Sequence, residues 1–162
     1  LLENFGGHTY AAGLSLKEEN LDAFTQRFLK LAADEIIPEQ MTPQIDIDAV
    51  LDLQDINSKF MSELKKMNPF GPDNQKPVFC SLGVKDYGTS KLVGKDLEHI
   101  KLELIDDKSN TPIHGIAFGM HQHNTHIKNM KPFNICYTIE ENTYNGNTSL
   151  QLMVKDIKEN DI

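Results

Sequence analysis

Strict alternation between apolar and polar residues dominates the C-terminal half of the chain. Apolar side chains occupy every second position there, which is the period of a strand with one buried face. Turn residues such as Asn145-Gly146 separate the segments. The predicted strands are 78–87, 100–104, 133–139 and 150–154, with 111–119 as a less regular fifth. Five short strands with one longer polar connection, at 120–132, predict a small Greek-key barrel.

The N-terminal part has helical periodicity instead. Its apolar stripe, with spacings of three and four, is Leu21, Phe24, Phe28 and Leu31. This spacing predicts an amphipathic helix over about 17–35 that ends before Pro38. Ser15 and Glu18 have the spacing of a capping box at its start. A lone helix cannot bury such a stripe, so it needs a neighbouring domain, and left exposed it would favour an artificial dimer.

A linker with Pro38 and Pro43 leads into a second segment that connects to the barrel. Residues 44–51 alternate acidic and aliphatic side chains and predict a strand. A helix is expected over about 55–67, and the turn-rich residues 68–74 end it. The expected fold class is therefore α+β. It combines a fragment of an α/β domain (1–40), a connector strand, helix and loop (41–76) and a five-stranded OB-like β-barrel (77–162).

The Gly6-Gly7-His8 sequence near the start of the chain is a candidate anion site. Both glycines can adopt positive φ, so their amides could converge into a nest of donors. A helix starting near His8 would add unpaired amides at the same place. The structural alternative is a helix-entry turn with a capping histidine, and a short glycine-rich match leaves both interpretations open.

Charge and composition exclude some function classes. The net charge is −8, whereas a simple nucleic-acid-binding domain is usually basic. Residues 78–155 contain equal numbers of lysines and acids, so the excess lies in the flanks. The acidic run there, predicted to be a solvated face, is Asp46, Asp48, Asp52 and Asp55. The mean hydropathy is −0.42 and no apolar run is long enough to span a membrane. Cys80 and Cys136 are expected to be buried free thiols in a reducing cytoplasm.

Several motifs, taken in order along the chain, resemble one enzyme family. They are Gly6-Gly7-His8 with Ala11-Ala12-Gly13, Asn68-Pro69-Phe70-Gly71 with Asn74, Pro77-Val78-Phe79, His99-Ile100-Lys101-Leu102, Asn145-Gly146, Leu150-Gln151-Leu152 and Lys155-Asp156-Ile157. In this order they resemble the bacterial single-stranded-DNA exonuclease RecJ, over nearly the whole chain. The glycine-histidine motif is shared by DHH phosphoesterases in general. One departure is Asp73, which stands where the family usually has a second glycine and argues against a phosphate contact in that loop.

The resemblance implies the C-terminal part of a longer enzyme that degrades single-stranded DNA from its 5′ end in DNA repair and recombination. Residues 1–40 would then be the end of a DHHA1 domain, and 77–162 an OB-fold domain. The family's divalent metal, Mg²⁺ or Mn²⁺, is held by an upstream DHH domain, so this part is expected to position DNA and to be inactive by itself. Gly6, Gly7 and His8 would contact a substrate phosphate. The DNA-binding candidates are Lys85, Tyr87, Lys91, Lys95, Lys101, Lys128, Lys131 and Tyr144.

Other interpretations remain open. His121, His123 and His126 have ligand-like spacing, but a histidine triplet in a polar connection rarely satisfies metal geometry, so no metal site is assigned. His99 and His114, within strands, are expected to be structural. The alternative functions are a module that docks replication or repair proteins or braces the catalytic domain, and a DHH phosphoesterase for short oligonucleotides or cyclic dinucleotides. The expected partners are single-stranded DNA and the upstream domain, with no membrane.

Overall fold

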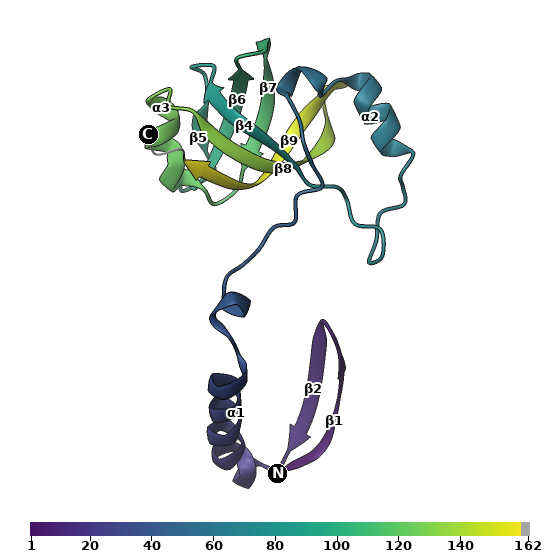
Figure 1. The fold of residues 1–162 in the computed structure, drawn as a ribbon, viewed down its shortest axis with the longest axis vertical. Helices are drawn as coiled ribbons and strands as arrows, with labels where there is room; N and C mark the ends of the chain where they lie inside the picture. The colour runs from purple at the N-terminus through teal and green to yellow at the C-terminus, as the bar shows by residue number, and fades with distance from the viewer. Residues whose placement is uncertain (160–162) are drawn as a thin grey trace. The chain divides into compact units, whose positions relative to one another are not determined.

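The computed structural model describes residues 1–159 and divides the chain into two compact units (Figure 1). The N-terminal unit is Leu1–Ile45, and the sheet unit begins at Asp46. None of the helices among the described residues combines the length and the apolar character needed to cross a bilayer. The division into 1–40, 41–76 and 77–162 made from the sequence stays a prediction.

The N-terminal unit opens with an antiparallel hairpin of β1 (Leu2–His8) and β2 (Ala11–Leu16). Gly6 pairs with Gly13 and His8 with Ala11. The prediction of a helix starting near His8 is therefore wrong. Neither Gly6 nor Gly7 has a positive φ, so the expected nest of amides does not form. A side chain at Gly7 would meet the Ala11 carbonyl oxygen at 2.8 Å, and this close approach explains the glycine in extended backbone.

Helix α1 (Leu21–Glu35) follows a single 3₁₀ turn at Glu18–Asn20, so the predicted helix at 17–35 is present but begins later. The predicted capping box is wrong, because Ser15 lies in β2 and the residue that caps α1, Asn20, makes no side-chain cap hydrogen bond. The helix ends with Ile36 in extended conformation, and a second 3₁₀ turn spans Pro38–Met41.

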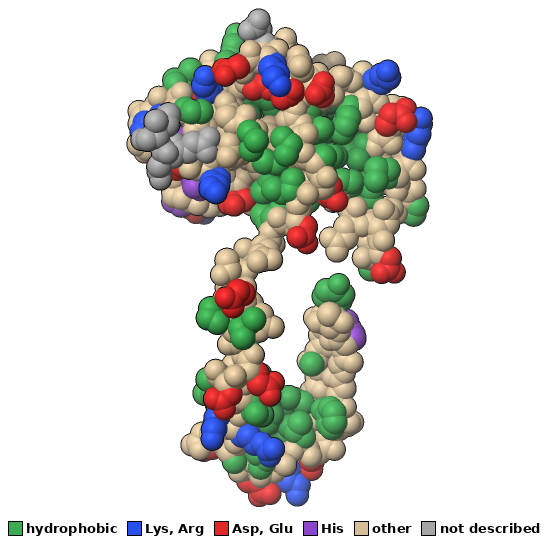
Figure 2. Space-filling model, viewed as in Figure 1, with side chains coloured by type: hydrophobic (Ala, Val, Ile, Leu, Met, Phe, Trp, Pro, Cys, Tyr) green, Lys and Arg blue, Asp and Glu red, His purple; other side chains and the backbone are tan. Residues whose placement is uncertain are grey.

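The apolar stripe of α1 is uncovered within its unit. Phe24 and Phe28 stack on each other with ring centroids 5.8 Å apart, yet Phe28 is 58% exposed and no residue of the helix is buried. Figure 2 shows hydrophobic side chains on the surface of this unit. The predicted core role of Phe24 and Phe28 is therefore not realised by the unit alone, as expected for a helix that lacks its packing partner.

The sheet unit is built on seven strands. They are β3 (Ala49–Val50), β4 (Phe79–Asp86), β5 (Lys91–Val93), β6 (His99–Asp106), β7 (Ser109–Ala117), β8 (Phe133–Tyr144) and β9 (Asn147–Glu159). Their order is β3-β4-β8-β9-β7-β6-β5, and a further pairing joins β4 to β6. Each of the five strands predicted from 78 onward is present. The edge strand β5 is an addition. The strand predicted at 44–51 shrinks to β3, where only Ala49 and Val50 pair with β4.

The inward faces of these strands form one core, as their alternation predicts. Ile100, Leu102 and Leu104 of β6 are completely buried, as is Tyr137 of β8. The Tyr137 hydroxyl shares a 2.7 Å hydrogen bond with Ser81 Oγ, so the buried phenol is satisfied. Burial raises the pKa of Tyr137 far above its usual range. A rigid core of this kind holds the outward side chains of the same strands in fixed positions.

Helix α2 (Ser58–Lys65) and the loop after it close one side of the sheet unit. The helix is shorter than the predicted 55–67 because Asn57 caps it, with Oδ1 accepting hydrogen bonds from the amides of Lys59 and Phe60. In the following loop, Asn74 Nδ2 donates to the carbonyl oxygens of Met67 and Pro69, at 2.7 and 3.0 Å. Asn74 therefore has a structural role, which is to close the Pro-Phe-Gly loop.

The acidic run before α2 is partly structural and not only a solvated face. Asp48 Oδ2 accepts a hydrogen bond from the Val78 amide at 2.9 Å. Asp52 pairs with Lys108 at 2.7 Å, which raises the pKa of the lysine. These contacts attach the connector, including a 3₁₀ turn at Leu53–Asp55, to the sheet.

Candidate nucleic-acid interface

A groove of about 450 Å³ crosses the outward face of the sheet unit, on the side of β5, β6 and β7. The tip of the β8–β9 hairpin forms its other wall. The lining residues are Val93, Lys101, His114, Ile116, Asn142, Tyr144, Ser149 and Gln151. They come from five strands, so the groove exists only in the folded sheet.

Strand register explains why these side chains share one surface. Lys91 pairs directly with Lys101, Lys101 with Ile116, and His114 with Gln151. Directly opposed residues project from the same face of a sheet. The residues between them, such as Gly115 and Leu102, point inward and are buried. The period of two therefore places Lys101, His114 and Ile116 at the groove and Leu102 in the core.

Tyr144 owes its position to the tight hairpin between β8 and β9. Asn145 and Gly146 both have positive φ, 50° and 78°, as the two central residues of a type I′ turn require. The ring of Tyr144, directly before the turn, is 74% exposed although it lines the groove. An exposed ring on a rigid turn is available to stack on a planar ligand.

The groove carries little net charge. Lys101 is the only lysine or arginine among its lining residues, and Lys91 stands beside it on the edge strand. Glu103 approaches from β6, with Oε1 3.5 Å from His114 Nδ1 and a hydrogen bond from the Thr89 hydroxyl. The arrangement suits a ligand with flat apolar rings and a few anionic groups better than a densely charged one.

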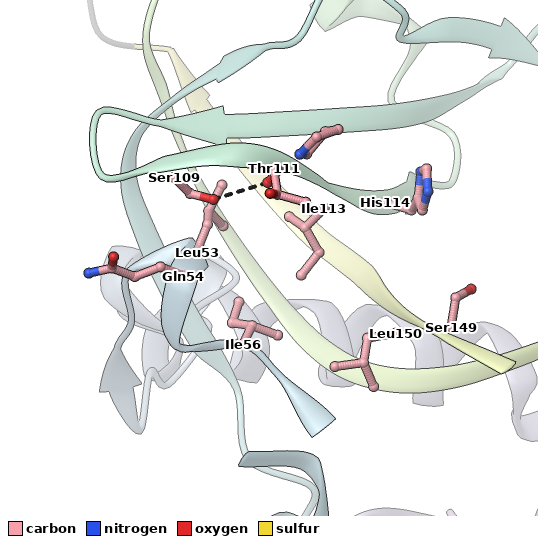
Figure 3. Close-up of a pocket in the computed structure, with 10 residues that line it drawn as sticks. Leu53, Gln54, Ile56, Ser109, Thr111, Ile113, His114, Ser149 and Leu150 are labelled. Atoms are coloured by element: carbon pink, nitrogen blue, oxygen red, sulfur yellow. Dashed lines mark hydrogen bonds between the residues drawn. The ribbon is translucent and has the colours of Figure 1, made fainter. Parts of the chain in front are cut away.

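A second hollow of about 410 Å³ adjoins the groove and shares His114 and Ser149 with it (Figure 3). Its apolar lining is Leu53, Ile56, Pro112, Ile113 and Leu150, and its polar lining adds Gln54, Ser109 and Thr111. Figure 3 shows the Ser109 hydroxyl directed at the Thr111 carbonyl, to which it donates at 3.0 Å. The concave surface therefore continues over β7 and β9 to the connector.

Comparison with known proteins identifies this architecture. The family model described as the RecJ OB domain matches residues 47–156, more than half of the chain. The chain belongs to this family. The matched RecJ OB region lies within the sheet unit and contains every residue that lines the groove.

Curated relatives extend the similarity beyond the RecJ OB domain. The chain is 28% identical to the single-stranded-DNA-specific exonuclease RecJ of Haemophilus influenzae, over 98% of this chain and 27% of that protein. It is also 28% identical to the Bacillus subtilis enzyme of the same name, over 96% of this chain and 20% of the relative. The chain thus spans about a quarter or less of the length of these relatives.

A solved RecJ structure shows the same fold. The crystal structure of Thermus thermophilus RecJ in complex with Mn²⁺ matches with a TM-score of 0.76 at 20% identity, over 100% of this chain and 22% of that one. The mixed architecture dominated by a sheet is therefore that of the corresponding RecJ region.

The residues predicted to bind DNA do not all lie at the groove of the RecJ OB domain. Lys91, Lys101 and Tyr144 lie together at the groove. Lys85 instead pairs with Asp107 at 3.1 Å, and Lys128 Nζ is 3.6 Å from the buried Asp86 Oδ2. The other candidates, Tyr87, Lys95 and Lys131, lie in segments between strands and line none of the hollows described above.

The Gly-Gly-His segment belongs to the other unit. Gly6 lines a shallow hollow of about 300 Å³ on the β1–β2 hairpin, opposite Gly13. His8 Nδ1 accepts a hydrogen bond from the Tyr10 amide at 3.2 Å. A neutral His8 in this position carries its proton on Nε2, which leaves one outward donor for an anion.

The three histidines of the polar connection do not form a metal site. The connection folds into a 3₁₀ turn (His121–His123) and α3 (Asn124–Lys128). His123 Nδ1 and His126 Nδ1 both face the Glu159 carboxylate, at 2.7 and 3.2 Å, and His126 Nε2 donates to the Pro132 carbonyl oxygen. No group of three ligands able to hold a metal ion occurs among residues 1–159. The contacts of His123 and His126 with Glu159 instead fasten α3 to the end of β9. The divalent metal implied by the family therefore does not fit these residues.

The buried titratable groups are structural. Burial raises the pKa of the Cys80 and Cys136 thiols, and both cysteines are free. They pair across β4 and β8, outside the groove. Burial opposes ionisation of Asp86, but hydrogen bonds from Ser90 and Gly88 and the charge of Lys128 outweigh it and lower the pKa. Asp86 therefore fixes the loop between β4 and β5.

Sequence reasoning missed Asn142, Ser149 and Gln151, which add hydrogen-bonding groups to the groove. It also assigned His114 a purely structural role, whereas this side chain lines both hollows. The alternation along 147–155 could have indicated that Ser149 and Gln151 share one face. Their proximity to Lys101 depends on the pairing of β7 with β9, which no local signal indicates.

Proposed function

We propose that this chain is the single-stranded-DNA-binding region of a RecJ-type 5′-3′ exonuclease acting in DNA repair and recombination. The observation that carries the proposal is the groove of the RecJ OB domain, which joins Lys101, Lys91 and the exposed Tyr144 on one rigid surface. The chain positions the strand, and cleavage takes place in the part of the enzyme that holds Mg²⁺ or Mn²⁺.

The groove supplies the two interactions that single strands need. Tyr144 offers a ring on which a base can stack, and Lys101 and Lys91 offer charges for phosphates. Asn142, Ser149 and Gln151 add donors and acceptors that sugars or base edges can use. Because stacking tolerates any base, the expected binding has little sequence preference.

The N-terminal unit has a separate role in this proposal. Residues 1–40 form the end of a DHHA1 domain, whose remaining elements cover the stripe of α1, while 41–76 connect it to the OB barrel at 77–162, in which β5 is added to the five predicted strands. The exposed Phe28 and Leu31 support this assignment, since such a stripe is stable only against a partner. Gly6, Gly7 and His8 contact a substrate phosphate through extended backbone and the His8 Nε2 proton.

A salt titration tests the binding function. Labelled oligo(dT) is titrated into the full chain at about 20 mM and about 200 mM salt, a range in which two phosphate contacts would cost roughly 25-fold in affinity. Lys101→Ala should weaken binding and make the slope of log K against log salt shallower by about 0.7. Lys66→Ala is the matched control, because Lys66 directly follows α2, is exposed, and has its ion pair with Glu63.

Two outcomes would contradict this function. One is the absence of oligo(dT) binding at the lower salt concentration, and the other is binding of equal strength at both concentrations. The near-neutral groove would then favour the second candidate, a module that docks a repair protein or braces the catalytic domain.

A further inference from the structure

The outward face of β7 continues beyond the groove. His114 and Ile116 line the groove, while Gly115 and Ala117 between and after them are buried. Phe118, in the turn directly after β7, is exposed and so continues this alternation of exposed and buried residues. Its ring is 55% exposed, so it contributes little to the core. At a strand rise of about 3.3 Å per residue, Phe118 lies roughly 7 Å beyond Ile116 along the same face.

Contacts with β6 hold the Phe118 ring in place. The His99 ring meets it edge to face, with centroids 4.9 Å apart and planes at 79°. His99 is itself held, because its Nδ1 accepts a 3.0 Å hydrogen bond from the Gly119 amide and its Nε2 lies 3.4 Å from Glu98 Oε1. Phe118 is therefore a braced aromatic surface and not a freely rotating side chain.

Exposed aromatic rings are rare in the described part of the sheet unit. Only Tyr87, Phe118 and Tyr144 are large aromatic residues exposed by half or more there. Tyr144 lies at one wall of the groove, and Phe118 extends the groove's floor along β7. Lys101, two residues after His99 on β6, stands on the same face between them.

We propose that Phe118, braced by His99, is a second base-stacking platform and that a bound single strand runs from the Tyr144 groove along β7 to this ring. The proposal rests on the proposed function, since it extends the same binding surface. Continuity with the groove favours a nucleobase over an apolar protein segment as the occupant. The added path of roughly 7 Å accommodates about two stacked nucleotides at 3.4 Å each.

Tryptophan fluorescence tests the platform directly, because the chain contains no tryptophan. In Phe118→Trp, the single indole should be quenched when oligo(dT) long enough to cross both sites binds. Phe118→Ala should weaken binding of that oligonucleotide about fivefold or more, the low end of what one stacked base contributes. An oligonucleotide that fills only the groove should bind Phe118→Ala and the parent chain equally.

Leu82→Ala provides the matched control, since Leu82 on β4 is 58% exposed and lies outside the groove. The platform is refuted if the indole emission of Phe118→Trp is unchanged at saturating oligo(dT), or if Phe118→Ala binds like the parent while Tyr144→Ala binds weakly. The second pattern leaves the proposed function intact. Failure of the parent chain to bind any oligonucleotide refutes both.

Discussion

Replacing Tyr144 with alanine is expected to weaken oligo(dT) binding about tenfold or more. One stacked base contributes about 1–3 kcal/mol in single-strand binding, and Tyr144 is the most exposed ring at the groove. The substitution should leave folding intact, because the ring is 74% exposed and the turn conformation belongs to Asn145 and Gly146. Fluorescence anisotropy with labelled oligo(dT) measures the affinity, and urea unfolding measures the stability.

Two further variants give this experiment its controls. Tyr144→Phe keeps the ring and should retain most of the affinity, because stacking does not need the hydroxyl. Tyr10→Ala removes a ring that is 85% exposed in the N-terminal unit and should leave groove binding unchanged. If Tyr144→Ala binds as tightly as the parent, the groove does not hold a base against this side chain.

The second large effect concerns Asp86 and the stability of the sheet unit. Its side chain is completely buried, and Oδ1 accepts a hydrogen bond from the Ser90 amide at 3.1 Å. Lys128 Nζ lies 3.6 Å from the other oxygen. Asp86→Ala should lower the free energy of unfolding by about 2–3 kcal/mol, the contribution of hydrogen bonds to a charged group, measured by urea unfolding at pH 7.

The pKa of Asp86 also gives a pH dependence with a defined sign. Its pKa is lower in the folded chain than in the unfolded chain, through hydrogen bonds from Ser90 and Gly88 and the charge of Lys128, which together outweigh burial. The unfolded state therefore binds more protons as the pH falls. The stabilisation is complete above the pKa that Asp86 has in the unfolded chain, about 3.9. It is lost as the pH falls through the lower pKa that Asp86 has in the folded chain.

Asp86→Asn separates charge from shape in this experiment. It removes the ionisation, so the loss of stability between about pH 5 and pH 2 should become shallower than in the parent chain. Asp107→Asn is the control, because the Asp107 side chain is 87% exposed in its pair with Lys85 and should change stability little. An unaltered acid profile for Asp86→Asn would show that other carboxylates govern the acid unfolding.

Local patterns predicted the strands of the sheet unit better than its edges. The alternation along 100–104 and 150–154 was sufficient because each strand has one face in the core. Strand β5 was missed because three residues, Lys91–Val93, are too few to show a period. The strand expected at 44–51 was overestimated because Asp48 uses its side chain to bond the Val78 amide.

The N-terminal motif shows the limit of a composition argument. Gly6-Gly7-His8 is compatible with an anion nest by residue type, but antiparallel pairing with Ala11-Ala12-Gly13 uses the same glycines in extended backbone. Glycine permits several conformations, and the neighbouring strand selects among them. The phosphate contact of this segment thus stays a prediction for His8 and the hairpin.

Along 100–104 and 150–154 the sequence by itself determined which residues face the core, because a period of two assigns alternate side chains to opposite faces. Through the resemblance of its motifs to RecJ, it placed Lys101 and Tyr144 among the binding candidates. Only the tertiary structure decided that these two line one groove. It also decided that Lys85 forms an ion pair with Asp107 and Lys128 with Asp86. Strand order is set by long-range pairing, β7 with β9 and β4 with β6, and such pairing leaves no period in the chain.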